Sequence, residues 1–322
     1  MTSHVVRARA PRGQPSVLVI DRSGEAVARH LEDAAHFTGG HADAVARPRT
    51  EAEVAGLLEA STRVLTIGAQ SSVTGGATPD GGLVLSTERL TSIHEPGQDK
   101  IRVGAGVPLE TLQKLLRQHG RWYAPVPTFT GAFVGGVVAT NAAGAATFKY
   151  GTTRDWVDGL TVVLACGCVL DLERGQVRAD SSAGFEIGCA HGTRRFQPGS
   201  YRMPAVPKCS AGYFAAPEMD LVDLFVGSEG TLGVIVEATL RVLPAPPSVA
   251  FALVPLDSEA VAIALVDELR RASAETWRQN DARGIDVAAI EHLDRRCLEI
   301  LREDGADRRS NLTIRPGTEL ML

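Results

Sequence analysis

The sequence is short of cysteine, and its cysteines follow no recognisable pattern. Its 322 residues contain five cysteines, an odd number without a CxxC spacing. Neither a disulfide framework nor a zinc or iron–sulfur motif follows from such a set. We therefore interpret them as small buried hydrophobic residues of a protein in a reducing cytoplasm, and we predict no metal site. The five are Cys166, Cys168, Cys189, Cys209 and Cys297.

The sequence also lacks a strong excess of either charge. A net charge of −5 at neutral pH offers no electrostatic basis for binding nucleic acid or an anionic membrane surface. Arg7 and Arg9 interrupt the N-terminal residues, so no signal peptide is predicted. Residues 122–148 carry no charge and exceed the roughly 20 residues that span a bilayer. Their prolines, glycines and missing helical periodicity instead predict irregular buried backbone. We expect a cytoplasmic protein without a transmembrane segment.

Glycine, in contrast, is abundant and unevenly distributed. The chain has 33 glycines, and 16 of them lie within residues 68–167. Glycine is the residue that tolerates positive φ and close approach of a bulky group. This region is therefore predicted to bring its backbone close to something large.

Hydrophobic periodicity predicts a chain that mixes strands and helices. Thr50 opens a capping box that starts one helix, and Pro108 starts a second helix that ends at Gly120. Cys166 and Gly167 lie in a predicted hairpin. Strands are predicted at 17–20, 64–67, 83–86, 101–103, 160–164, 169–172 and after the glycine turn 227–233, with a helix around 26–35 and many loops in 173–220.

A run of prolines at 244–247 is the best candidate for a domain boundary. Beyond it the pattern predicts a strand at 251–256 and a helix that begins after Ser258. A second helix over 290–301, a strand at 312–314 and the beginning of a strand at 319–322 complete the prediction.

A glycine loop that follows the strand at 64–67 has the composition of an anion-binding site. It contains no lysine or arginine but is rich in small and hydroxyl side chains, and backbone N–H groups of such loops bind anions. Several hydrogen bonds of roughly 1.5–3 kcal/mol each could hold a pyrophosphate without a lysine. A tight surface turn is the alternative. The loop comprises Gly68, Ala69, Gln70, Ser71, Ser72, Val73, Thr74, Gly75 and Gly76.

Two common nucleotide motifs are absent from the sequence. No glycine loop supplies the lysine that a GxxxxGK[ST] phosphate loop requires. Gly104 and Gly106 begin a GxGxxG pattern, but Leu109 stands at the third glycine position. A Rossmann dinucleotide site is therefore not predicted.

A second glycine-rich segment spans residues 125–144. Its paired glycines and small residues let the backbone approach a flat ligand, while Thr128, Thr140 and Asn141 offer polar contacts. A large, flat, mostly apolar cofactor with a diphosphate would fit both glycine segments. FAD is the candidate that meets this description.

Four motifs in order carry a resemblance to a known family. GAQSSVTGG (68–76), PVPTFTGAFVGGVVATNAAG (125–144), KYGTTRDWVDGLTVVLACG (149–167) and GSEGTLGVIVEATLRVLP (227–244) resemble the FAD-binding domain of vanillyl-alcohol oxidase or PCMH-type flavoproteins. They are most like the FAD-linked oxidases that include glycolate oxidase flavoprotein subunits and D-lactate dehydrogenases. The resemblance covers about residues 37–245.

The resemblance implies an α+β fold and a division of the chain. Residues 37–245 would form a two-subdomain PCMH-type FAD-binding domain after an N-terminal extension, 1–36. Residues 246–322 would be part of an α/β cap domain that binds substrate, and we expect this domain to be incomplete in a truncated chain.

The resemblance also implies which residues hold FAD. The loop 68–76 would wrap the pyrophosphate, and we expect Gly75 and Gly76 to adopt positive φ there. A second group would lie along the flavin and ribityl chain, and a third would close the site, partly through main-chain groups. Val234 and Ile235 could instead be plain strand core, and Glu229 could merely order its turn. The second group is Pro127, Thr128, Gly135, Gly136, Thr140, Asn141 and Gly144; the third is Glu229, Gly230, Gly233, Val234 and Ile235.

One position departs from some relatives in the family. These attach FAD covalently through a histidine of the pyrophosphate loop, where this chain has Gln70. Residues 122–149 contain no histidine or cysteine. We therefore predict that FAD is bound without a covalent link.

The function implied by the resemblance is oxidation of a small 2-hydroxy acid, such as D-lactate or glycolate, by hydride transfer to flavin N5. The electron acceptor stays unspecified, and the residues give no secure catalytic base. Arg154 and Lys208 are candidates for binding the substrate carboxylate, although a structural role is the favoured alternative for each. The alternative function is a non-catalytic FAD-binding subunit or truncated chain that needs a C-terminal part or a partner subunit.

Overall fold

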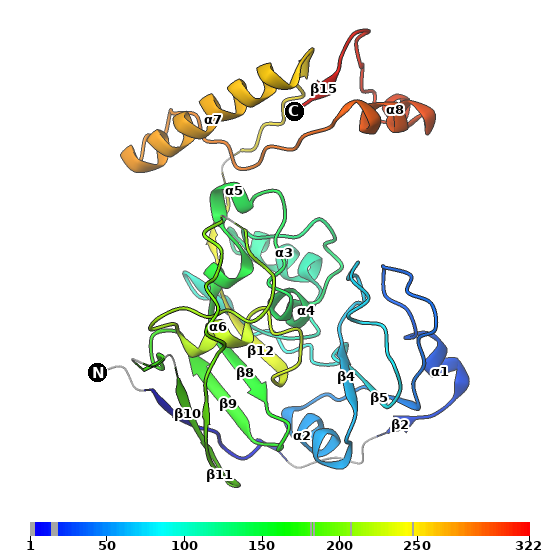
Figure 1. Cartoon of the computed structure of the whole chain (residues 1–322), viewed down its shortest axis with the longest axis vertical. Helices are drawn as coiled ribbons and strands as arrows, with labels where there is room; N and C mark the ends of the chain where they lie inside the picture. The colour runs from blue at the N-terminus through cyan, green and yellow to red at the C-terminus, as the bar shows by residue number, and fades with distance from the viewer. Residues whose placement is uncertain (1–3, 14–18, 181, 183, 207, 247) are drawn as a thin grey trace. The chain divides into compact units, whose positions relative to one another are not determined.

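The computed structural model describes residues 4–13, 19–180, 182, 184–206, 208–246 and 248–322. The chain divides into two compact units, coloured along the chain in Figure 1. The first unit comprises Met1–Gly144 and Gly151–Ala245, and the second comprises Ala145–Tyr150 and Pro246–Leu322. Residues 4–36, which the sequence assigned to an extension, contribute β1 (Val5–Arg7) and β2 (Ile20–Asp21) to sheets of the first unit.

One sheet of the first unit has the order β2-β3-β5-β4. Its two parallel pairings, of β3 with β5 and of β5 with β4, confirm the predicted strands at 64–67 and 83–86. Residues 17 and 18 of the strand predicted at 17–20 lie outside the described residues. The helices α1 and α2 connect these strands. The bounds are β3 (Ala44–Ala46), α1 (Gly24–Ala28), α2 (Glu51–Ala60), β4 (Val64–Ile67) and β5 (Leu83–Ser86).

The predicted capping box and the predicted helix at 26–35 have different outcomes. Thr50 Oγ1 accepts the Glu53 N–H at 3.2 Å, which confirms the start of α2. The helix at 26–35 is wrong beyond Ala28, where α1 ends. The reason is that Asp33 turns the chain, because its carboxylate accepts the N–H groups of Ala35 and Ala77.

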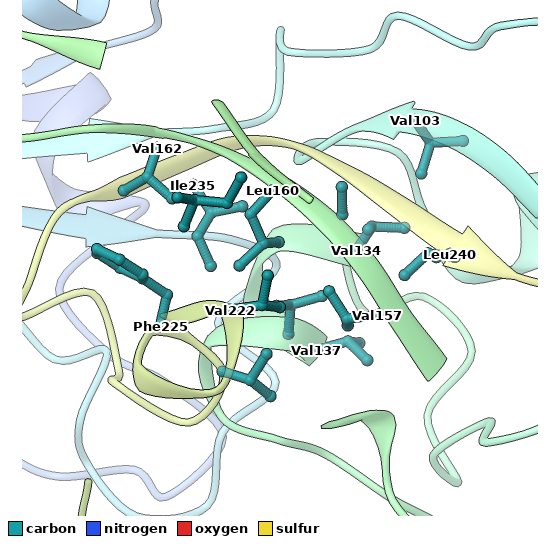
Figure 2. Packing of buried hydrophobic residues seen from close by; sticks show 14 of the residues in the cluster. Val103, Val134, Val137, Val157, Leu160, Val162, Val222, Phe225, Ile235 and Leu240 are labelled. Atoms are coloured by element: carbon teal, nitrogen blue, oxygen red, sulfur yellow. The ribbon is translucent and has the colours of Figure 1, made fainter. Parts of the chain in front are cut away.

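The main core of the first unit lies on the antiparallel sheet β6-β12-β8-β9. Figure 2 shows Leu160, Val162 and Ile235 of the sheet packed with Val137 and Phe225 of two short helices. The bounds are β6 (Lys100–Gly104), α3 (Leu109–Gln118), α4 (Val134–Ala139), β8 (Val157–Val163), β9 (Val169–Glu173), α6 (Leu221–Phe225) and β12 (Val234–Arg241). The predicted hairpin, the second helix and the long strand after the glycine turn are confirmed.

Residues 173–220 are less irregular than predicted. They contain a hairpin whose outer strand is exposed and polar, which hid it from a hydrophobicity pattern. The hairpin joins β1 in the order β1-β10-β11, and a short ribbon pairs β7 with β13. The remaining bounds of the first unit are β7 (Arg121–Trp122), the 3-10 helix η1 (Thr153–Trp156), β10 (Phe185–Cys189), β11 (Gly192–Phe196) and β13 (Leu243–Pro244).

The second unit has one long helix and a two-stranded sheet. The strand predicted at 319–322 is confirmed as β15, which pairs with β14. The strand predicted at 251–256 forms only at its end, and residues 312–314 form no strand. The helix predicted at 290–301 begins at Arg295, because Asp294 caps it through the Cys297 N–H. The bounds are α5 (Thr147–Tyr150), β14 (Pro255–Leu256), α7 (Glu259–Gln279), α8 (Arg295–Glu303), α9 (Ala306–Arg309) and β15 (Leu320–Met321).

Candidate functional site

Three segments that are far apart in the sequence meet in the first unit. A Cβ atom placed on Gly68 would lie 3.6 Å from Phe133 Cβ and 3.9 Å from Gly136 Cα. A Cβ atom on Gly76 would lie 3.6 Å from Glu229 Oε2. The Glu229 N–H in turn donates to the carbonyl of Ala139 at 2.8 Å. The fold thus brings together the three segments that the sequence predicted to bind one cofactor.

The first glycine loop is held by a segment that sequence analysis missed. Gln70 Nε2 donates to the carbonyls of His30 and Ala77 at 3.0 and 2.9 Å. The carbonyl of Gln70 accepts the Ala34 N–H, and the buried Asp33 carboxylate accepts the Ala77 N–H. Asp33, directly before the small residues of a turn, was the available signal for this support.

The first loop leaves several hydrogen-bond donors unused. In the described chain, the backbone N–H groups of Ser72, Val73, Gly75 and Gly76 have no acceptor. Free N–H groups in a compact loop are the donor set that binds a phosphate or pyrophosphate. The expectation of positive φ is right for Gly75, at 78°, and wrong for Gly76. Of these two glycines, Gly75 alone has left-handed backbone.

A left-handed non-glycine residue occurs in each of the three segments. Gln70, Asn141 and Glu229 have φ of 49°, 49° and 52°. Such a conformation costs roughly 1–2 kcal/mol for an ordinary residue and persists where the surroundings enforce it. Asn141 is buried, its Oδ1 accepts the Arg154 N–H at 2.8 Å, and its Nδ2 donates to the Cys209 carbonyl at 3.2 Å.

The two adjacent glycines of α4 have opposite surroundings. The Gly135 N–H donates to the Ala105 carbonyl at 2.8 Å, and a Cβ atom on Gly135 would lie 2.6 Å from Ala105 Cβ. Gly135 is therefore required by packing. A Cβ atom on Gly136 would meet no heavy atom within 4 Å. Gly136 thus leaves an open, side-chain-free face beside the first loop, where a flat ring could lie.

Four more of the predicted site residues belong to the second segment. Three of them are Pro127, Thr128 and Gly144, and a Cβ atom on Gly144 would overlap the Val126 carbonyl. Thr140 is exposed, and its hydroxyl donates to the Gly136 carbonyl at 2.9 Å.

The third segment combines a glycine turn with a buried strand. Gly230 and Gly233 have φ of 77° and 154°. The side chains of Val234 and Ile235 are buried in core clusters of β12, which leaves only their main chain for a ligand.

The two cationic candidates contact the protein itself. Arg154, whose side chain is 13% exposed, donates to the carbonyls of Asp223 and Val226 and pairs with the Asp223 carboxylate at 3.5 Å. Its guanidinium also lies 4.4 Å from the centre of the Phe214 ring. Burial lowers the pKa of Arg154, although Asp223 opposes that effect. Lys208 Nζ donates to the Ala143 carbonyl at 3.1 Å. Both side chains therefore bind main-chain carbonyls of the first unit, and the assignment of either to a substrate carboxylate stays a prediction.

The interpretation of the cysteines needs a correction. Only Cys168 is buried, whereas Cys297 is exposed and the other three are half-buried. Cys297 lies on α8, where the second unit has little to pack against it. Cys166, Cys168 and Cys189 come together, a grouping that their sequence separation concealed.

A cavity of about 420 Å³ lies within the second unit. Its walls are mainly apolar side chains of α7 together with Phe148 and Ile290. Arg270 and His292 are its cationic and imidazole groups, and sequence analysis assigned neither a role. No helix in the described residues is long and apolar enough to cross a membrane.

Comparison with known proteins finds a matching family model and several relatives. Residues 42–173 match the family model described as an FAD binding domain. The chain is 31% identical over 262 residues to a D-lactate dehydrogenase of Archaeoglobus fulgidus, which covers 80% of this chain and 48% of the relative. It is 28% identical over 269 residues to the glycolate oxidase subunit GlcD of Bacillus subtilis, covering 81% and 47%.

Further relatives match this chain over part of their own length. A D-2-hydroxyglutarate dehydrogenase of Xanthomonas citri pv. viticola is 35% identical over 188 residues, which covers 57% of this chain and 32% of the relative. The solved structure of an alkyldihydroxyacetonephosphate synthase matches with a TM-score of 0.62 at 16% identity, covering 94% of this chain and 51% of that one. This match confirms the α+β fold. The chain spans about half the length, or less, of these relatives.

Proposed function

We propose that this chain oxidises a small 2-hydroxy acid with bound FAD, because residues 42–173 match an FAD binding domain and its relatives include a D-lactate dehydrogenase and a glycolate oxidase subunit. The observation that carries the proposal is the meeting of three glycine-rich segments around the open face of Gly136. These residues fit the cofactor, since the site offers both unused N–H donors and a surface without side chains. FAD supplies a two-electron acceptor for the hydride that the substrate loses.

The first loop would hold the pyrophosphate of FAD. The unused N–H groups of Ser72, Val73, Gly75 and Gly76 are the proposed donors. Hydrogen bonds to a charged group contribute roughly 1.5–3 kcal/mol each, so four of them replace the missing lysine. The carbonyl and amide of Gln70 hold the loop in the shape that exposes these donors.

The second and third segments would position the flavin. Gly136 provides the face against which a planar ring can lie, and Pro127 and Thr128 belong to the chain that leads into it. Glu229 and Gly230 form a turn beside the first loop, since Gly230 approaches Thr66 and Glu229 approaches Gly76. We propose that this turn closes the site through its main chain.

The relatives' names point to one class of substrate. D-lactate, glycolate and D-2-hydroxyglutarate share a hydroxyl group on the carbon next to a carboxylate. Removing hydride from that carbon requires a base for the hydroxyl proton and a cation for the carboxylate. Arg154 already binds Asp223 and Val226, so the first unit offers no such cation at that position.

The cytoplasmic location inferred from composition stays a prediction.

The alternative is that the chain holds FAD and depends on another polypeptide segment for chemistry. It is favoured by the relatives' length and by the name of the GlcD relative, which is a subunit. An anaerobic titration of the full-length protein with D-lactate, glycolate and D-2-hydroxyglutarate separates the two. Saturable bleaching of the flavin supports the oxidase. FAD binding without bleaching, even by excess acid, supports the alternative.

Residues 1–322 reconstituted with FAD give a sharper test. If the base and the carboxylate-binding groups lie elsewhere, stopped-flow reduction by these acids should stay near background. Fast, saturable reduction would assign those groups to this chain and turn attention to Arg270 and His292 of the second unit.

The pyrophosphate assignment has its own test. Gly75→Ala places a Cβ on a residue at φ 78°, and Gly175→Ala does the same at φ 92° outside the site. Both should cost about 1–2 kcal/mol of stability, because both impose left-handed backbone on alanine, and the methyl group at position 75 also displaces the exposed Phe37 ring, which lies 2.9 Å away. Only Gly75→Ala should lower FAD affinity. Equal FAD occupancy in the two variants would remove the loop from the site.

The absence of a covalent link is tested by acid precipitation. Gln70 occupies the position of the linking histidine and is already engaged by two carbonyls. Yellow FAD should therefore appear in the supernatant. Flavin that stays in the pellet would contradict the prediction. His30→Ala and Cys209→Ser would then locate the attachment, because His30 adjoins the loop and Cys209 adjoins Asn141.

A further inference from the structure

Three cysteine sulfurs gather at one place in the first unit. The Sγ atoms of Cys166, Cys168 and Cys189 all lie within 4.8 Å of one another. All three are free thiols. Cys168 is buried, and the other two are half-buried. None of the three belongs to the glycine segments of the cofactor site.

The fold brings these cysteines together through two turns. Cys166 and Cys168 flank Gly167, whose φ of 76° bends the β8–β9 hairpin so that both sulfurs lie on one side. Cys189 is the last residue of β10. The N-terminal segment joins the two, because Ala8 N–H donates to the Gly188 carbonyl and Arg9 bridges Val169.

The turn between β10 and β11 adjoins the cluster. Its residues Ala190 and His191 follow Cys189 directly, and His191 is exposed. An imidazole is therefore available next to the three sulfurs, and imidazole and thiolate are both ligands that zinc prefers.

We propose that Cys166, Cys168 and Cys189 form a three-thiolate site for a thiophilic metal ion, with Zn²⁺ as the expected occupant. Zn–S bonds of about 2.3 Å in tetrahedral geometry place the sulfurs about 3.8 Å apart. The sulfurs already lie within 4.8 Å, so each moves by a fraction of this difference on binding. Thiolates select zinc or copper(I) over oxygen-seeking Mg²⁺ and Ca²⁺.

The chemistry of binding involves no oxidation. Each thiol releases its proton to solvent as its Zn–S bond forms, so three protons leave for each ion bound. Water takes the fourth position, unless His191 of the adjoining turn supplies its imidazole. The ion would fasten the β1-β10-β11 sheet to the β8–β9 hairpin, which few backbone hydrogen bonds join.

A disulfide is the competing fate of these thiols. It would need two sulfurs at about 2.05 Å and would leave the third cysteine unpaired. Packing alone explains the buried Cys168 but not two half-buried thiols beside it. The convergence of three sulfurs, rather than two, therefore favours a metal.

The test begins with protein purified anaerobically after growth with zinc. Mass-spectrometric metal analysis should find one zinc per chain, and Cys166→Ser and Cys189→Ser should each remove it. Cys209→Ser and Cys297→Ser are matched controls, since neither belongs to the cluster, and both should keep the metal. His191→Ala should keep zinc if water is the fourth ligand.

Cobalt titration of the wild-type protein keeps the test independent of folding in the variants. Co²⁺ should give thiolate-to-cobalt charge-transfer absorption in the near ultraviolet, and added Zn²⁺ should remove it. Absence of this absorption together with absence of zinc would overturn the proposal. A mass lower by two hydrogens in the anaerobic protein would identify a disulfide instead and would overturn it as well.

Chelation separates this inference from the cofactor assignment. Removing the ion should lower the melting temperature and speed hydrogen exchange in β10 and β11, while FAD stays bound. Loss of FAD without a change in β10 would show that the ion does not fasten this sheet.

Discussion

The two units of this chain differ in how their conformation is enforced. The first unit contains all three clusters of buried hydrophobic residues found in the described chain. In the second unit, the 21-residue helix α7 buries only Ala262, Ser273 and Thr276. Phe251 of the same unit is 96% exposed. The left-handed residues of the cofactor site thus rest on an enclosed core, whereas the second unit has little buried surface to hold its backbone.

Hydrogen exchange should show the largest difference between the units. Amides of β8 and β12 should exchange only by global opening, which takes about 5–15 kcal/mol in a typical domain. Amides of α7 should open at several kcal/mol less, because few of its side chains are buried. Exchange followed by mass spectrometry checks this. Equal protection of α7 and β12 would contradict the comparison.

The comparison also explains which sequence predictions held. In the first unit, the strands at 64–67 and 83–86 and the hairpin after Val163 formed as predicted. There the hydrophobic pattern and the core agree. In the second unit, residues 312–314 had a strand pattern but formed no strand among the described residues. A local hydrophobic pattern is a weak determinant of secondary structure where no hydrophobic core packs against the segment.

What the sequence could not reveal was support from distant residues. The loop motif at 68–76 was recognised, but its attachment to Asp33 and His30 depends on folding. The cysteine cluster depends in the same way on the pairing of β1 with β10. A glycine that packing requires and a glycine with open space around it look the same in a sequence. Only the structure distinguishes Gly135, which packs against Ala105, from Gly136, which has no neighbour within 4 Å of a Cβ position.

Loss of Arg154 should destabilise the first unit more than loss of a half-exposed ion pair. Arg154→Met removes the donor to the carbonyls of Asp223 and Val226, at a cost of about 1–3 kcal/mol, while the Asp223 carboxylate keeps its pair with Arg174. The turn that begins at Gly227 should loosen, and FAD affinity should fall with stability. Arg241→Met is the control, because its pair with Asp158 is half-exposed and worth at most about 1 kcal/mol.

Urea unfolding and FAD titration measure both effects of the Arg154 substitution. Exchange in α7 should not change, since the altered contacts lie within the first unit. A stability loss no larger than that of Arg241→Met would remove Arg154 from its supporting role.

The adjacent glycines of α4 should respond in opposite ways. Gly135→Ala should destabilise the apoprotein by about 1–3 kcal/mol, because the new methyl group meets Ala105. Gly136→Ala should stabilise the apoprotein by up to about 1 kcal/mol, because alanine favours helix and the position is open. Gly136→Leu should keep the fold and weaken FAD binding at least about tenfold, or 1.4 kcal/mol. Melting temperatures measured with and without FAD check the substitutions at both positions. Unchanged FAD affinity in Gly136→Leu would place the flavin elsewhere.

The smallest predicted effect concerns how stability depends on pH, which should differ between the two units. Glu237 of β12 accepts hydrogen bonds from Arg102 Nε at 2.8 Å and from Ser92 Oγ at 2.9 Å. Burial alone would raise the pKa of Glu237, but the bonds from Arg102 and Ser92 outweigh burial and lower it. A carboxyl group whose pKa is lower in the folded state stabilises the fold above its unfolded pKa of about 4.3. That contribution disappears as the pH falls through the folded pKa.

Glu237→Gln should therefore cost about 1 kcal/mol at neutral pH and nothing in acid, where the wild-type carboxyl is protonated as well. Asp286→Asn is the matched change in the second unit. Hydrogen bonds from Lys149 and Trp277 lower the pKa of Asp286, but its side chain is 47% exposed, so the loss should be smaller. Urea unfolding across the acid range should show the Glu237 effect on the first unit, while hydrogen exchange should show the Asp286 effect on α7. If the wild-type protein and Glu237→Gln still differ in unfolding free energy in acid, packing rather than the charge on Glu237 supplies the stability.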